Sequence, residues 1–170
     1  MAGQDFSSSM LSLAPPLVRR AFQDVLGISL DPLSASEWHM VDRLVLPTRH
    51  ALNVGLGNEE WRGLLVLAFD DDSWGIVPGG EEDAAMDKDA LGEVLNTVGG
   101  FFAAEPNFHA HLGELLQAPP MYFDTEVTYP KAESLSGVLR MGHMTMSFGW
   151  ALLPAISPLM RKALERLGKI

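Results

Sequence analysis

The chain has 170 residues, of which 47% are hydrophobic and 20% charged, so it is long and apolar enough to bury a single core. Its 22 acidic residues against 12 Lys and Arg give a formal net charge of −10, and such a surface repels the phosphates of nucleic acids. The lack of cysteine excludes disulfides, thiolate catalysis and cysteine-ligated metal sites. We therefore expect a globular protein that binds no nucleic acid, and the composition is compatible with the reducing cytoplasm.

The first half of the chain predicts one helix followed by short antiparallel strands. We expect a flexible N-terminal segment over 1–14 and one domain over 15–170. From Pro16 onwards apolar residues recur at helical spacing, and Gly27 is placed to end that helix. Strands are predicted over 43–47, 51–55, 62–69 and 74–77, with turns at 58–60 and 70–73.

The second half alternates between helices and strands. A helix is predicted from Asp87 to about Ala104, because Pro106 prevents much further continuation. After it we expect a short helical piece over 109–117, strands over 121–129, 138–148 and 150–153, and a last helix that Ser157 caps and Gly168 ends. The stretch 141–160 is long enough to span a bilayer, but its two prolines and polar residues favour strands, so no membrane segment is expected. This order predicts an α+β fold, with a mostly antiparallel sheet of about six strands packed against long helices.

The helix over 87–104 has two different faces. At 100° per residue its large apolar residues fall in one arc roughly 120° wide, which predicts the buried face. The opposite side carries Glu93, Asn96 and Gly100 nearly in line, with Thr97 on one flank and Gly92, Gly99 and Ala103 on the other. Each helical glycine costs about 0.8–1 kcal/mol relative to alanine, so three of them indicate the close approach of another chain segment.

This pattern admits a structural interpretation and a functional one. Glu93 can be an ordinary solvent-facing residue, and the glycines can pack against another helix of the same chain. Alternatively, Glu93 and Asn96 are neighbours one turn apart that point to the same place, on a surface with almost no bulk.

The ten residues from Leu91 to Gly100 resemble the motif of the CheX/CheC-type chemotaxis phosphatases. In that family an acid and an asparagine three apart, followed four residues later by glycine, sit on a long helix. The resemblance extends to the strand over 63–69 and to Ala118-Pro119-Pro120, and it covers roughly residues 15–155. One copy of the motif is present, so the chain is similar to CheX, with a single active face, rather than to CheC, with two.

The resemblance implies hydrolysis of the aspartyl-phosphate on a CheY-like response regulator in chemotaxis or two-component signalling. By that resemblance Asn96 orients the attacking water, and Glu93 pairs with the active-site lysine of the regulator. Thr97, Gly99 and Gly100 would contact the partner, the two glycines keeping the helix surface low. The resemblance further implies a homodimer and no cofactor of its own, since Mg²⁺ comes with the regulator.

Two alternatives remain open at this stage. The first is a non-catalytic module of the same fold that binds or scaffolds a response regulator. The second is a metal-dependent hydrolase that uses His109 and His111, but ligands at i and i+2 suit a strand, whereas this segment has helical character. No metal site is therefore predicted.

Overall fold

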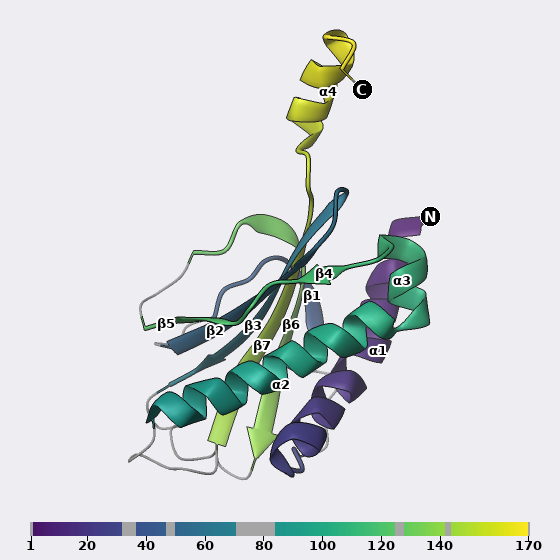
Figure 1. Ribbon diagram of the computed structural model, residues 1–170. Helices are drawn as coiled ribbons and strands as arrows, with labels where there is room; N and C mark the ends of the chain where they lie inside the picture. Colours follow the sequence, from purple (N-terminus) through teal and green to yellow (C-terminus); the bar gives the residue numbers. More distant parts are fainter. Residues whose placement is uncertain are drawn as a thin grey trace.

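A computed structural model describes residues 2–31, 37–46, 50–70, 84–124, 128–141 and 144–169 of the chain. The helices are α1 (Ala2–Leu26), α2 (Ala84–Ala104), α3 (Pro106–Leu112) and α4 (Pro158–Arg166). The strands are β1 (His39–Arg43), β2 (His50–Gly57), β3 (Trp61–Phe69), β4 (Leu116–Gln117), β5 (Met121–Phe123), β6 (Lys131–Met141) and β7 (Met144–Pro154). Helices α1, α2 and α3 lie together on one face of the sheet (Figure 1).

The strands form one antiparallel sheet in the order β1-β6-β7-β3-β2-β4, and β5 pairs with β2 further along the same edge. The β2–β3 hairpin turns at 58–60 as predicted, because the Asn58 side chain accepts hydrogen bonds from the backbone of Glu60 and Trp61, each at 2.9 Å. The predicted α+β fold with a mostly antiparallel sheet is confirmed. The predicted strand over 74–77 and most of the turn at 70–73 lie outside the described residues.

The last hairpin differs from the prediction. Strands expected over 138–148 and 150–153 are replaced by β6 and β7, whose pairing begins at Met141 and Met144. Gly149, which lies between the two predicted ranges, is in the middle of β7. A Cβ atom on Gly149 would lie 2.7 Å from Leu44 Cδ1, so this glycine makes room for a side chain rather than ending a strand.

The first strand also lies earlier than predicted, at His39–Arg43 rather than 43–47. It is an edge strand that pairs with β6, and none of its five residues is fully buried. Trp38, just before it, is buried against Gly137 and lies 5.7 Å from the Phe148 ring. The buried indole therefore fixes the start of β1, where the apolar run 44–46 suggested a later strand.

The segments on either side of β4 are shorter than predicted. The helical piece expected over 109–117 is α3, which begins at Pro106, and Glu105 caps it by accepting from the Asn107 backbone at 3.2 Å. The strand expected over 121–129 is limited to β5 among the described residues. Helix α3 ends at Leu112 because Gly113 follows it with a positive φ of 77°, and Pro119 and Pro120 separate β4 from β5.

The main core lies between the sheet and helices α1, α2 and α3. The structure corrects the expected flexible segment over 1–14, because α1 begins at Ala2 and continues through Pro15 and Pro16. Phe6 and Met10 are buried in the core, and the Phe6 ring lies 6.0 Å from that of Phe108. Burying such side chains stabilises the folded protein by about 1.5–3 kcal/mol each. This gain offsets part of the free energy that the two prolines cost inside the helix.

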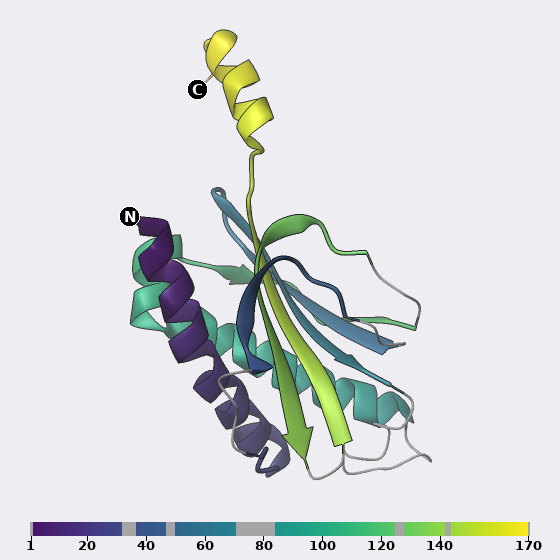
Figure 2. The ribbon, with the colours of Figure 1, turned by 180° about the vertical axis from the view of Figure 1, so that it is seen from behind.

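The opposite face of the sheet, seen in Figure 2, carries a smaller apolar cluster that includes Leu44 and Tyr129. Helix α4 begins where predicted, since Ser157 accepts a hydrogen bond from the Met160 backbone at 3.2 Å. It extends away from the sheet in both views and has no buried residue (Figures 1 and 2). Among the described helices none is long and apolar enough to cross a membrane.

Candidate functional site

Helix α2 lies across the sheet and buries the face that its periodicity predicts (Figure 1). Its side chains at most 3% exposed are Leu91, Val94, Leu95, Val98 and Phe102. Phe101 is partly buried, and the Arg20 guanidinium of α1 lies 4.7 Å from the centre of its ring. This packing fixes the rotation of α2 and so determines which residues lie on its outer side.

The outer side carries Glu93 and Asn96 one turn apart, as expected. Glu93 is exposed and Asn96 is half-buried. Both line an open depression of about 450 Å³, together with Thr97 and the segment 117–120. The hydroxyl of Thr97 donates to the Glu93 carbonyl at 2.8 Å, so it is used within the helix. A carboxylate and an amide therefore lie side by side in a shallow, open depression.

The glycines on this helix do meet another segment of the chain. A Cβ on Gly92 would lie 3.3 Å from Pro120 Cβ, and one on Gly99 would lie 2.8 Å from Gln117 Nε2. The close approach inferred from the sequence is confirmed at these two positions. The neighbour is the extended segment that contains β4 and the two prolines, not the second helix of the structural interpretation. A Cβ on Gly100 would meet no neighbouring segment of the described chain within 4 Å, so that position is open.

Gln117 is the residue of this site that the sequence did not indicate. Its Nε2 atom donates to the backbone carbonyl of Asn96 at 2.7 Å and to Asn96 Oδ1 at 2.6 Å. The nearest signal was its position directly before Ala118-Pro119-Pro120, a segment to which the family resemblance extends. Gly99, which we expected to contact a partner, faces the Gln117 side chain, whereas Gly100 on the same helix faces open space.

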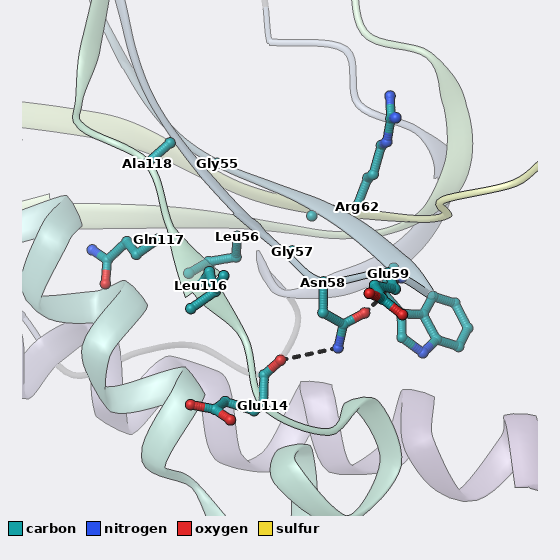
Figure 3. Close-up of a pocket in the computed structure, with 12 residues that line it drawn as sticks. Gly55, Leu56, Gly57, Asn58, Glu59, Arg62, Glu114, Leu116, Gln117 and Ala118 are labelled. Carbon is teal, nitrogen blue, oxygen red and sulfur yellow. Dashed lines mark hydrogen bonds between the residues drawn. The ribbon is translucent and has the colours of Figure 1, made fainter.

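A larger depression of about 840 Å³ lies between the β2–β3 hairpin and residues 114–118 (Figure 3). Asn58 spans it by donating to the carbonyls of Leu112 and Glu114, at 2.7 and 3.0 Å. In Figure 3 the side chain of Gln117 points away from Asn58 and Glu59. The polar contacts in this depression join the hairpin to the connection after α3, which is a structural role.

The two histidines considered as metal ligands lie on α3. His109 is exposed, whereas the His111 ring stacks on Phe6 with 4.1 Å between ring centres. No group of three or more His, Asp or Glu side chains that could hold a metal occurs among the described residues. His111 therefore has a packing role in this structure.

Comparison with known proteins places the fold. The chain matches no known protein-family profile, and no characterised protein is significantly similar to it in sequence. Among solved structures, CheX from Desulfovibrio desulfuricans is 15% identical, with a TM-score of 0.61 over 82% of this chain and 96% of that one. A chain of the CheX–CheY–BeF₃–Mg²⁺ complex from Borrelia burgdorferi is also 15% identical, with a TM-score of 0.55 over 82% and 94%.

The same fold occurs outside the CheX proteins. A chain of the FliG–FliM complex from Helicobacter pylori is 12% identical, with a TM-score of 0.58 over 87% of this chain and 91% of that one. At identities this low, the structural similarity shows the fold alone. The chemistry has to be inferred from the residues of the site. The chain therefore has the fold of the CheX and CheC-like chemotaxis proteins, as the motif on α2 implied.

Proposed function

We propose that this protein is a phosphatase that hydrolyses the aspartyl-phosphate of a CheY-like response regulator in chemotaxis or another two-component pathway. One observation carries the proposal: Glu93 and Asn96 lie side by side on the open, low face of α2, in a fold shared with CheX. The surface beside them is shallow, which suits a folded protein as the substrate better than an enclosed small molecule.

The reaction needs no covalent intermediate on the enzyme. A water attacks phosphorus in line, the bond between phosphorus and the aspartyl oxygen breaks, and the regulator recovers its carboxylate while inorganic phosphate leaves. Because a carboxylate is a good leaving group, positioning and electrostatic stabilisation supply most of the catalysis. Asn96 would orient the water through its side-chain amide, and Glu93 would pair with the regulator's active-site lysine to fix the docked geometry.

The metal in this proposal belongs to the partner. Mg²⁺ bound by the regulator would neutralise the phosphoryl oxygens, so this chain would need no cofactor of its own. The neighbour solved with CheY, BeF₃ and Mg²⁺ shows that a protein of this fold forms a complex that contains Mg²⁺ and beryllium fluoride, which has the shape and charge of a phosphoryl group. Thr97 and Gly100 would border the contact. We place the activity in the cytoplasm and expect a homodimer, both as parts of the same proposal.

A second candidate is a non-catalytic module that binds or scaffolds a response regulator. The chain of the FliG–FliM complex favours it, because the same fold there belongs to an assembly of two named proteins. Both candidates use the outer face of α2 for docking. They differ in whether Asn96 contributes to turnover.

The test measures loss of the phosphoryl group from a panel of phosphorylated CheY-like receiver domains in Mg²⁺, with the protein present in substoichiometric amounts. Wild type is compared with Asn96→Ala, Glu93→Ala and a control, Asn107→Ala, which replaces an exposed asparagine on α3. We expect Asn96→Ala to lower the maximal rate by about 10²-fold. Glu93→Ala should mainly weaken binding, and the control should behave as wild type.

Two results would contradict the proposal, the first in the role of Asn96 and the second in the activity itself. Acceleration that persists fully in Asn96→Ala would place the chemistry elsewhere. Binding to a receiver domain without any acceleration of phosphate loss would favour the non-catalytic module.

A further inference from the structure

The contact between Gln117 and Asn96 joins two different parts of the fold. Gln117 lies on β4, which pairs with the β2 edge through Leu56, and the next backbone amide, of Ala118, donates to the Gly55 carbonyl at 2.8 Å. Asn96 lies on α2. The two hydrogen bonds from Gln117 therefore link Asn96, on α2, to the edge of the sheet.

The hydrogen bonds also determine which atom of each amide faces the other. A backbone carbonyl only accepts, so the Gln117 atom 2.7 Å from the Asn96 carbonyl has to be Nε2. Because Nε2 only donates, the side-chain atom of Asn96 that meets it at 2.6 Å has to be Oδ1. The Asn96 amide is thus held in one of its two flipped orientations, with both protons of Nδ2 and the second lone pair of Oδ1 left for other partners.

Gly99 makes this arrangement possible. A Cβ there would lie 2.8 Å from Nε2, 2.9 Å from Cδ and 3.2 Å from Oε1 of Gln117. Three such similar distances mean that the amide group presents its flat side to the helix at Gly99. Any larger residue would push the Gln117 amide away from α2. This contact explains why position 99 is a glycine although glycine lowers the stability of a helix.

We infer that Gln117 is a positioning residue: it holds the Asn96 amide, through Oδ1, in the orientation that the attacking water requires. This inference rests on the proposed phosphatase function and adds to it a residue from a different element. A fixed amide loses less freedom when the regulator docks, and a small misplacement of a water-orienting group is costly in rate. Gln117 acts through Asn96 and touches neither the phosphoryl group nor the water.

Kinetics with a phosphorylated receiver domain test the role. Gln117→Ala removes the donor, and Gln117→Glu replaces it with a carboxylate that faces two acceptor oxygens, so both should free or flip the Asn96 amide. We expect kcat to fall by about tenfold with KM changed less than twofold. Leu116→Ala is the matched control, because it truncates the exposed neighbour on the same strand and should keep the wild-type kcat.

Gly99→Ala provides an independent route to the same defect, since it displaces the Gln117 side chain without changing it. It should lower kcat about as much as Gln117→Ala does, and the double variant should be no worse than either single one. This non-additivity separates a shared mechanism from two unrelated losses.

The side-chain NH₂ signal of Asn96, assigned by its loss in Asn96→Ala, reports the contact in the free protein by NMR. It should move in Gln117→Ala and in Gly99→Ala and stay in place in Gly100→Ala, where the added methyl group meets open space. An active wild type whose kcat is unchanged in Gln117→Ala, or an Asn96 signal that does not respond, overturns the inference and leaves the phosphatase standing. A wild type that accelerates phosphate loss from no receiver domain overturns both.

Discussion

Replacing Gly137 with alanine should destabilise the protein strongly, because Trp38 occupies the space that the new methyl group needs. A Cβ at Gly137 would lie 2.3 Å from Cδ2 of the indole, with two further ring atoms at 2.4 and 2.5 Å. These distances are more than 1 Å inside van der Waals contact. The ring is rigid and 5% exposed, so it cannot relieve the overlap by turning a flexible end away.

The magnitude follows from two limits. If the core shifts to accept the methyl group, overpacking costs about 1–3 kcal/mol. If the indole is expelled, the loss approaches the roughly 3–5 kcal/mol that removing a buried tryptophan costs. We therefore expect about 3 kcal/mol, which lowers Tm by roughly 6–12 °C in a domain of this size.

Thermal and denaturant unfolding, followed by circular dichroism, measure this effect. Gly100→Ala is the matched control, since it makes the same change to the unfolded chain but meets open space on α2, and it should stabilise by up to about 1 kcal/mol. In a Trp38→Ala background Gly137→Ala should cost little further. A Gly137→Ala protein within about 0.5 kcal/mol of wild type would refute the packing of Trp38 on this strand.

Three further predictions concern stability. Phe6→Ala should cost about 3–5 kcal/mol in denaturant unfolding, because Phe6 belongs to the core, and a change under 0.5 kcal/mol would support a loose N-terminus instead. Truncation before α4 should leave Tm unchanged, because no residue of that helix is buried, and a clear loss would reveal contacts of α4 with the sheet. Burial raises the pKa of the Tyr129 phenol from 10.0 to about 12, so the unfolded state ionises first and the stability that Tyr129 contributes is lost as pH rises from 10 towards 12. Tyr129→Phe should show a smaller drop in unfolding midpoint than wild type over that range, and equal drops would contradict the burial.

The parts of the fold that the sequence predicted are those set by local rules. The buried face of α2 follows from helical periodicity over about three turns, from Leu91 to Phe102, and the β2–β3 hairpin follows from the turn chemistry of Asn58. Both agree with the structure because nothing distant competes with them.

The predictions are wrong where contacts between residues far apart in the sequence determine the bounds of an element. Pro15 and Pro16 predicted a helix start, but Phe6 and Met10 find partners on α3 and the sheet, which extends α1 to Ala2. The predicted strands stopped on either side of Gly149, but this glycine lies within β7 beneath Leu44, a residue 105 positions earlier in the chain. A single sequence cannot distinguish a glycine that turns the chain from one that makes room for a neighbour.

The same distinction applies to the candidate site. Glu93 and Asn96 were predictable because their spacing on one helix places them together. Gln117 was not, because its position beside Asn96 depends on the pairing of a two-residue strand with the edge of β2. Its contact with Gly99 now accounts for a helical glycine that the sequence could only mark as unusual.

The central claim is that the outer face of α2 catalyses phosphate release through Asn96. The most direct measurement is the amount of inorganic phosphate released per molecule of protein from an excess of phosphorylated receiver domain, above its spontaneous loss. We predict many turnovers for the wild type and, for Asn96→Ala, a rate lower by about 10²-fold although the receiver domain still binds. Release of no more than one phosphate per wild-type molecule, or equal rates for the two proteins, would contradict the account.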